Sequence, residues 1–138
     1  MTVMFIPKSS KLKKQQKGIF FNQINNQNSS DQVRFGSIGL KAMSFSILSS
    51  KQIETIKKTI NKQMKKTGRL VIHAFPNTPI SQKPLEIRMG KGSVDHWILK
   101  VKPGFILCEI VTDQIGFARK VLLSLKKKIN IKTLVIKS

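Results

Sequence analysis

The stretch PLEIRMGKG, residues 84–92, joins a short apolar run to a glycine-rich loop that carries fixed positive charge. The apolar half predicts a strand over residues 84–87, and the glycines that follow let the backbone approach a ligand closely. Arg88 and Lys91 are cations whose planar fork and point charge suit the oxygens of a phosphate. The alternative is a solvated hairpin turn that happens to carry two charges, because glycine-rich turns are common. The rest of the chain favours the anion-binding interpretation.

The composition is strongly basic, with 26 Lys and Arg against 6 Asp and Glu and a formal net charge of +20 over 138 residues. This length predicts one domain. Binding to a polyanion would relieve the self-repulsion of such a chain, so a nucleic acid is the expected partner and a membrane surface the competing one. No apolar run approaches the roughly 20 residues that span a bilayer, and the N-terminus does not resemble a cleavable secretory signal.

The residue types that carry catalysis or bind metal are sparse. The single cysteine, Cys108, lies in the apolar run at residues 105–111 and is expected to behave as a small buried hydrophobe. His73 and His96 fall on separate predicted strands without ligand-like spacing, which favours surface or RNA-facing hydrogen bonding. The acids are scattered singly, with no nucleophile beside a base. We therefore expect no enzyme activity, no catalytic residue, no metal and no cofactor.

The N-terminal segment is basic and of low complexity. Residues 8–17 contain five lysines and no acid, and such a segment cannot bury enough surface to fold alone. A polar stretch at residues 22–32 follows, so we expect an arm and connector over residues 1–33 and a single domain over residues 34–138. Phe20 and Phe21 are candidates either for contacting a groove or bases, or for docking onto the domain.

The next segments predict a bent strand and a basic amphipathic helix. Residues 34–47 are rich in strand formers interrupted by glycines, which predicts a strand with a bulge or bend. Ser49 and Gln52 have capping-box spacing, and the helix should run to about Thr67 with Gly68 as its C-cap. The expected buried face comprises Ile53, Ile56, Ile60 and Met64. The outward cations are Lys51, Lys57, Lys58, Lys62, Lys65 and Lys66.

The second half predicts further strands and one more helix. Residues 69–75 alternate as a strand and residues 77–83 form a polar loop. The runs at 96–101 and 105–111 flank a Pro103-Gly104 turn of type II and should pair as an antiparallel hairpin. The second helix is expected over residues 114–128, capped by Asp113, and a last strand over residues 131–136. The apolar face of the second helix comprises Ala118, Val121, Leu122 and Leu125. These elements predict an α+β fold with a small mixed or antiparallel sheet.

Several motifs occur in a fixed order: RFGSIGLKA at 34–42, SKQIE at 50–54, KPLE at 83–86, RMGKG at 88–92, KPG at 102–104, LCE at 107–109 and IKT at 131–133. Together they resemble the large-subunit ribosomal protein L-sixteen family, of bacterial and organellar type. The resemblance spans nearly the whole chain, and several motifs in one order are far more specific than any one of them.

The resemblance implies a fold of the α/β-hammerhead kind, bound to large-subunit rRNA near the aminoacyl-tRNA site and the peptidyl-transferase region, with a role in subunit maturation and tRNA positioning. It also implies three partners, namely rRNA, tRNA at the aminoacyl site and other large-subunit proteins, and neither a membrane nor a homo-oligomer. The implied rRNA- and tRNA-binding loop is Arg88, Met89, Gly90, Lys91 and Gly92. The implied rRNA-binding arm is Lys8, Lys11, Lys13, Lys14 and Lys17. A basic surface expected to bind rRNA comprises Arg34, Lys41, Lys58, Lys62, Lys65, Lys66 and Arg69.

The chain also departs from the pattern of that family. The loop passes directly from Gly92 to Ser93, where the family continues with a further Lys-Gly pair, and Ser9, Ser10 and Leu12 stand where the family has arginines. Abundant Asn, Ile and Lys are what A+T-rich coding would give, which favours a mitochondrial ribosome over a plastid or a bacterial cytoplasm. The alternative function is a free-standing nucleic-acid-binding protein of nucleoid or RNA-chaperone type.

Overall fold

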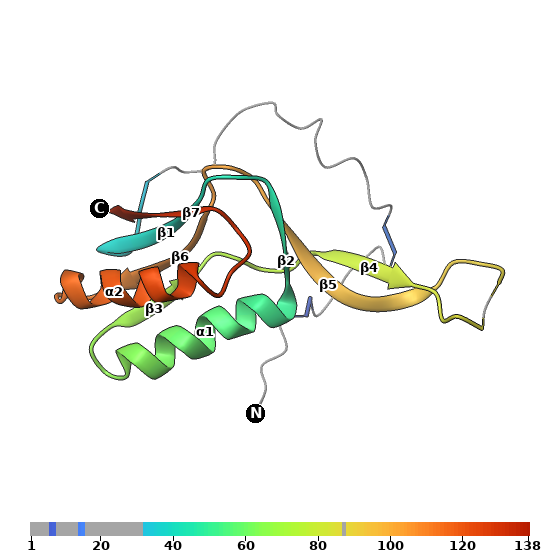
Figure 1. Cartoon of the computed structure of the whole chain (residues 1–138), viewed down its shortest axis with the longest axis horizontal. Helices are drawn as coiled ribbons and strands as arrows, with labels where there is room; N and C mark the ends of the chain where they lie inside the picture. Colours follow the sequence, from blue (N-terminus) through green and yellow to red (C-terminus); the bar gives the residue numbers. More distant parts are fainter. Residues whose placement is uncertain (1–5, 8–13, 16–31, 87) are drawn as a thin grey trace.

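The computed structural model describes residues 6–7, 14–15, 32–86 and 88–138. Within these ranges the chain forms seven strands and two helices (Figure 1). In chain order they are β1 (Ile38–Ala42), β2 (Ser46–Ser49), α1 (Ser50–Met64), β3 (Arg69–Ile72), β4 (Thr78–Gln82), β5 (Ser93–Val101), β6 (Ile106–Val111), α2 (Ile115–Lys126) and β7 (Thr133–Lys137).

The strands form two small antiparallel sheets. One has four strands in the order β3-β6-β1-β7, and the other has three in the order β2-β5-β4. The two helices lie side by side against the four-stranded sheet, and the β4–β5 ribbon extends away from them (Figure 1). The predicted α+β class is therefore confirmed, with every described strand pair antiparallel.

The hydrophobic core lies between the helices and the four-stranded sheet. Leu40 on β1 stands opposite Cys108 on β6, and both are fully buried. As predicted, the buried faces of the helices are Ile53, Ile56, Ile60 and Met64 on α1 and Ala118, Val121, Leu122 and Leu125 on α2. Burial, with the nearby charge of Glu109 adding to it, raises the pKa of the Cys108 thiol to about 12. Cys108 is therefore a packing residue, as its sequence context predicts.

Helix α1 begins as its sequence predicts but ends earlier. The Ser49 side chain accepts the N–H of Gln52, and the Gln52 side chain accepts the N–H of Ser49, which completes the capping box. The helix ends at Met64 instead of continuing to Thr67, and Lys65, with φ of 48°, takes the left-handed position expected of Gly68. The role of Gly68 is to leave room for close packing, because an added Cβ would lie 2.7 Å from the Met64 methyl carbon.

The predicted cap of the second helix is also wrong. Gln114, not Asp113, is the N-cap of α2, and it makes no side-chain capping bond. The N–H of Gln114 instead donates to the hydroxyl of Thr112 at 3.2 Å, while that hydroxyl donates to the carbonyl of Thr67 at 2.9 Å. Thr112 thus links the start of α2 to the segment after α1, a tertiary contact that no local capping pattern contains.

The strand predicted at residues 84–87 is wrong over residues 84–86, while Ile87 lies outside the described residues, and the polar loop predicted at residues 77–83 is also wrong. The strand is β4, which pairs with β5 from Thr78 opposite Ile98 onwards, and residues 84–86 belong to the turn beyond it. Pro79 is tolerated within β4 because this strand is at the edge of its sheet. Local hydrophobicity misled the prediction, since Leu85 is fully exposed at the hairpin tip.

The Pro103-Gly104 turn forms, but the strands that flank it do not pair with each other. The N–H of Phe105 donates to the carbonyl of Lys102 at 3.2 Å, and Gly104 has φ of 89°, as a type II turn requires. Strand β5 pairs with β2 and β4, whereas β6 pairs with β1 and β3. The predicted hairpin is therefore wrong, because this turn passes the chain from one sheet to the other.

The same change of sheet explains the bent strand predicted over residues 34–47. This segment forms β1 in one sheet and β2 in the other, with a register shift in the β1–β6 pairing between Leu40 and Lys41. The Gly104 N–H donates to the carbonyl of Ala42 at 2.8 Å, so the two segments that pass from one sheet to the other are hydrogen-bonded to each other. The predicted strands over residues 69–75 and 131–136 are present as β3 and β7, with shifted bounds.

We expect Leu122→Ala to lower the free energy of unfolding by about 2–5 kcal/mol, because it leaves a cavity in the core between the helices and the sheet. The adjacent Leu123, 45% exposed, provides the matched control, and Leu123→Ala should change stability by no more than about 0.5 kcal/mol. Urea denaturation of both variants measures the difference. Equal losses would contradict the assignment of the buried face of α2.

Candidate nucleic-acid interface

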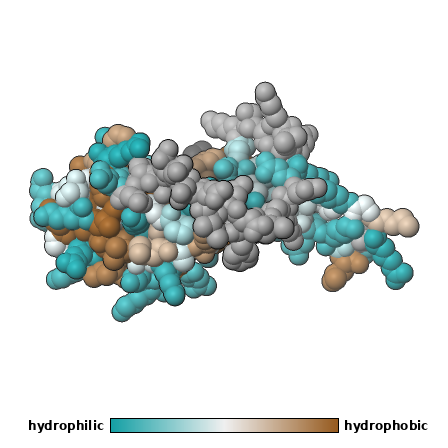
Figure 2. Space-filling model, turned by 90° about the horizontal axis from the view of Figure 1, so that it is seen from above, coloured by the Kyte–Doolittle hydropathy of each residue, from teal (hydrophilic) through white to brown (hydrophobic). Residues whose placement is uncertain are grey.

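The turn between β4 and β5 carries the loop predicted to bind RNA. It stands at the far end of the β4–β5 ribbon, away from both helices (Figure 1). Arg88, Met89, Gly90 and Lys91 are all exposed, and Met89 keeps 88% of its surface. Figure 2 shows hydrophobic side chains among hydrophilic ones at this end of the molecule. The loop therefore presents both cations and apolar side chains to any partner.

The two glycines of this loop have different structural roles. Gly90 has φ of 83°, a conformation that side chains disfavour, and an added Cβ would meet nothing within 4 Å. Gly92 is buried, and an added Cβ would lie 2.2 Å from the carbonyl oxygen of Gln82. Gly90 thus sets the shape of the exposed tip, whereas Gly92 allows the two strands of the hairpin to approach each other.

One residue of the predicted arm lies beside the loop. The Lys14 Nζ donates to the carbonyl of Lys91 at 3.4 Å, an exposed contact between positions 77 residues apart. The other arm residues, Lys8, Lys11, Lys13 and Lys17, lie outside the described residues, as do Phe20 and Phe21. Within the described part of the chain, the arm thus adds one cation to the hairpin tip.

The residues of the predicted basic surface do not share one face. Lys62, Lys65 and Lys66 are exposed at the end of α1, and the exposed Arg69 follows at the start of β3. Lys58, also exposed on α1, forms an ion pair with Glu54, with 2.9 Å between Nζ and Oε1.

Arg34 and Lys41 belong to the opposite face of the four-stranded sheet. Side chains alternate along β1, and the buried Leu40 faces the helices, so the adjacent Lys41 points the other way. The helix lysines and these two residues therefore form separate basic regions.

A buried carboxylate organises the face of the sheet that the helices leave uncovered. Glu109 on β6 is 1% exposed and stands opposite Gly39 on one neighbouring strand and Val71 on the other. It accepts the backbone N–H groups of Arg34, Phe35 and Gly36 at 3.2, 2.7 and 2.8 Å respectively. Its Oε1 also lies 3.0 Å from Nε2 of His73.

Hydrogen bonding decides the charge state of Glu109. Burial raises the pKa of its carboxyl, but the backbone hydrogen bonds from residues 34–36, together with the one from His73, lower it by more. The pKa therefore lies below its ordinary value, and the carboxylate is charged at neutral pH. Because a carboxylate only accepts hydrogen bonds, Nε2 of His73 carries a proton and donates it to this contact.

Gly36 makes the close approach of this segment to β6 possible. An added Cβ at Gly36 would lie 2.9 Å from both the Cβ of Glu109 and the carbonyl oxygen of Ile110. A side chain there would push the backbone away and lengthen the hydrogen bonds to the carboxylate. The motif RFG at residues 34–36 thus fits the carboxylate through its backbone, while its arginine and phenylalanine side chains stay exposed.

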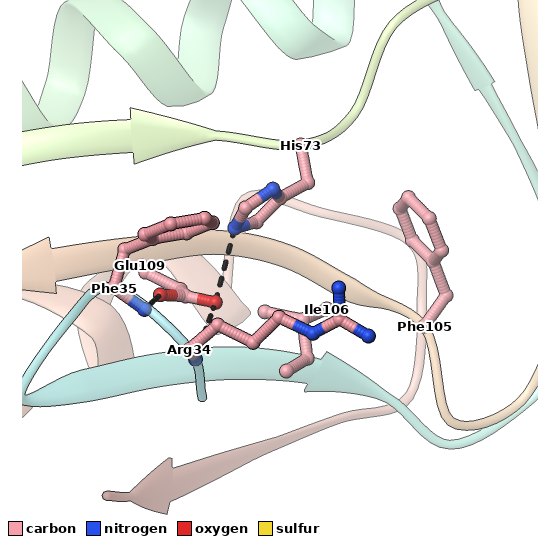
Figure 3. Close-up of a pocket in the computed structure, with 6 residues that line it drawn as sticks. All are labelled: Arg34, Phe35, His73, Phe105, Ile106 and Glu109. Carbon is pink, nitrogen blue, oxygen red and sulfur yellow. Dashed lines mark hydrogen bonds and ion pairs between the residues drawn. The ribbon is translucent and has the colours of Figure 1, made fainter. Parts of the chain in front are cut away.

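A cavity of about 150 Å³ opens beside this carboxylate, and we call it the aromatic pocket. It is lined by Arg34, Phe35, His73, Phe105, Ile106 and Glu109. The Phe35 and His73 rings are stacked, with centroids 6.1 Å apart and an interplanar angle of 28°. Figure 3 shows these two rings on one side, Phe105 on the other, and the Arg34 side chain extending between them.

The sequence predicts only part of this pocket. Arg34 is in the predicted basic surface and His73 is predicted to be a hydrogen bonder, but Phe35, Phe105, Ile106 and Glu109 are not candidate site residues. The available signal was Glu109 itself, a lone acid in the apolar run at residues 105–111. A charge buried in a strand needs partners, so its position alone indicates a hydrogen-bonded site.

Other kinds of site are absent from the described residues. No group of three or more His, Cys, Asp or Glu side chains there could hold a metal ion. His96 Nδ1 contacts the adjacent Asp95 at 2.8 Å, and both are on the surface. Neither helix of the described chain has the length and apolar character needed to cross a membrane.

Residues 7–136 match the sequence profile of the family Ribosomal protein L16p/L10e. The chain belongs to this family. It is therefore a large-subunit ribosomal protein without enzyme activity, and ribosomal RNA and other ribosomal proteins are its partners. The match extends beyond the folded domain into the basic arm, which agrees with the resemblance carried by the motifs along the sequence.

We expect Glu109→Gln to destabilise the fold by about 1–3 kcal/mol at pH 7, because its amide group cannot accept at both positions and leaves a buried N–H unsatisfied. The lowered pKa means that the charged carboxylate stabilises the folded state fully above its unfolded pKa of about 4.3. This contribution is lost as the pH falls through the lower folded value. Denaturation at several pH values should therefore show the difference between the two proteins shrinking in acid.

The exposed Glu86 supplies the control for this comparison. Glu86→Gln removes the same charge at the hairpin tip, where no buried donor depends on it, and should leave both stability and its pH dependence nearly unchanged. A Glu109→Gln protein as stable as Glu86→Gln would show that the buried carboxylate is not needed.

Proposed function

We propose that this ribosomal protein binds large-subunit rRNA near the aminoacyl-tRNA site, with its hairpin tip directed toward the peptidyl-transferase region. In this position it would support subunit maturation and the placing of tRNA during translation. The observation that carries the proposal is the exposure of Arg88 and Lys91 at the end of a projecting two-stranded ribbon. Family membership supplies the ribosomal setting.

The proposed mechanism is electrostatic. Cations on the loop neutralise phosphates and release the counterions condensed on folded RNA, while the hydrophobic core fixes where these charges stand. The proposed loop comprises Arg88, Met89, Gly90, Lys91 and Gly92, and Lys14 beside it represents the arm. Specificity comes from the shape of the RNA and from its unpaired segments. No residue of this chain takes part in peptide-bond chemistry, which we assign to the RNA.

The remaining cations are proposed to act as separate contacts. The arm, with Lys8, Lys11, Lys13 and Lys17, would add RNA contacts beside the loop, within a segment ending near residue 33. Lys62, Lys65, Lys66 and Arg69 would face a different part of the RNA from Arg34 and Lys41, because the sheet separates them. Lys58 should contribute less, since Glu54 already pairs with it.

We propose a mitochondrial ribosome as the location. The support is the abundance of Asn, Ile and Lys together with an arm in which serines and a leucine replace the family's arginines. A plastid and a bacterial cytoplasm are the alternatives. Family membership argues against the free-standing nucleic-acid-binding protein, since such a protein would not be a constituent of a ribosomal particle.

We expect the double variant Arg88→Gln/Lys91→Gln to reduce translation by purified large subunits, or their yield, by at least about tenfold, the factor that corresponds to the loss of one charge-assisted contact. The reason is that each charge-assisted hydrogen bond to phosphate is worth about 1.5 kcal/mol or more. The double variant Lys62→Gln/Lys66→Gln removes the same charge from exposed positions on α1 and should have a much smaller effect. Sucrose gradients at high salt, followed by a translation assay, measure both outcomes.

Two results would contradict the proposal in different ways. Equal losses from the two double variants would show that the loop is one basic patch among several. A wild-type chain that is absent from large subunits even at physiological salt would contradict its role as a resident constituent.

A further inference from the structure

The aromatic pocket is a feature of the described surface that the proposed loop and basic regions do not explain. Phe35 is 66% exposed and is not part of the core between the helices and the sheet, so its large apolar side chain has no packing role there. It lies on the opposite face of the sheet, together with His73, Phe105 and the Arg34 side chain (Figure 3). Exposed aromatic rings beside a cation, on a protein of net charge +20, suggest a role in binding.

Hydrogen bonds to Glu109 position the backbone and the histidine ring of the pocket. The backbone of Phe35 is held by its N–H donating to Glu109 at 2.7 Å, and Gly36 makes the next bond at 2.8 Å. The His73 ring is fixed by its hydrogen bond to the same carboxylate, and Ile106 in the pocket wall is 5% exposed. Binding a ligand here would therefore need little ordering of the backbone of residues 35–36 or of the His73 ring.

The size and chemistry of the pocket indicate one planar ring. A cavity of about 150 Å³ can hold a single aromatic ring but no folded segment. The oxygens of Glu109 already accept hydrogen bonds from internal donors, so they do not compete for the donor groups of a ligand. No acidic partner of the Arg34 guanidinium is found among the described residues.

We propose that the aromatic pocket holds one unpaired nucleotide of the rRNA. Its base would extend the Phe35–His73 stack toward Phe105, and its phosphate would meet the Arg34 guanidinium. This inference rests on the proposed rRNA-binding function and adds a defined site on the sheet face remote from the helices. An unpaired nucleotide fits better than a protein side chain, because it provides both a π-face for stacking and an anion for Arg34.

The test compares ribosomes that contain wild-type chain with ribosomes that contain Phe35→Leu. This substitution keeps the backbone N–H that Glu109 accepts and most of the apolar volume, but it removes the aromatic face. Large subunits are probed with dimethyl sulfate and a water-soluble carbodiimide, which together report on all four bases. We expect one nucleotide, or two adjacent ones, to become about fivefold more reactive in the variant, at the lower end of the effect of losing one base–aromatic stack.

Phe117→Leu is the matched control, because Phe117 is also exposed, on α2 and away from the pocket. It should leave the reactivity pattern of the rRNA unchanged. Identical patterns for wild-type and Phe35→Leu subunits, with the chain present in equal amounts, would overturn the inference alone. Absence of the wild-type chain from large subunits would overturn the proposed function and this inference with it.

A second measurement covers the case in which the variant fails to assemble. Ultraviolet crosslinking of wild-type large subunits, followed by mass spectrometry, should join a nucleotide to the peptides that contain Phe35, His73 or Phe105. A crosslink from these residues to another protein, or a crosslinked set that omits all three, would contradict the inference.

Discussion

The buried Glu109 carboxylate accepts hydrogen bonds from three consecutive backbone N–H groups and from one histidine ring. A buried charge of this kind costs several kcal/mol unless its hydrogen-bonding capacity is filled, and here it is. The segment at residues 34–36 therefore has one position relative to β6. That position fixes where the chain joins β1, and so where the arm that precedes it departs.

The two faces of the four-stranded sheet have different roles as a result. The face covered by α1 and α2 holds the hydrophobic core and no described acid (Figure 1). The other face carries Glu109, and the residues hydrogen-bonded to it include the stacked Phe35 and His73 and the adjacent Arg34. The β4–β5 ribbon then places a third group of charges at a distance from both faces.

Sequence periodicity predicted the buried faces of the helices because apolar residues three and four positions apart lie on one face of any helix. The buried faces of both helices are confirmed for this reason, and the capping box at Ser49 is also confirmed. The hairpin predicted across Pro103-Gly104 failed because turn chemistry fixes a change of direction and not the partner of each strand. Choosing between β4 and β6 as neighbours of β5 depends on contacts distant in sequence. The strand predicted at residues 84–87 was wrong over residues 84–86 for a similar reason, since a short apolar run does not distinguish a strand from an exposed hairpin tip.

The candidate site shows the same difference between features that depend on local sequence and features that depend on contacts distant in sequence. Fixed charges such as Arg88 and Lys91 could be identified from composition, and the structure exposes both. The aromatic pocket could not, because Phe35, His73 and Phe105 come from three segments that only the sheet brings together.

Amide hydrogen exchange at Phe35 and Gly36 tests the central role of Glu109 most directly. Both N–H groups precede β1 and donate to the carboxylate instead of to another strand, so their protection depends on this side chain. The account predicts slow exchange in the wild-type chain, and fast exchange in Glu109→Ala under conditions where the core amides of β1 stay protected. Fast exchange of both amides in the wild-type chain, or protection that survives in the variant, would contradict it.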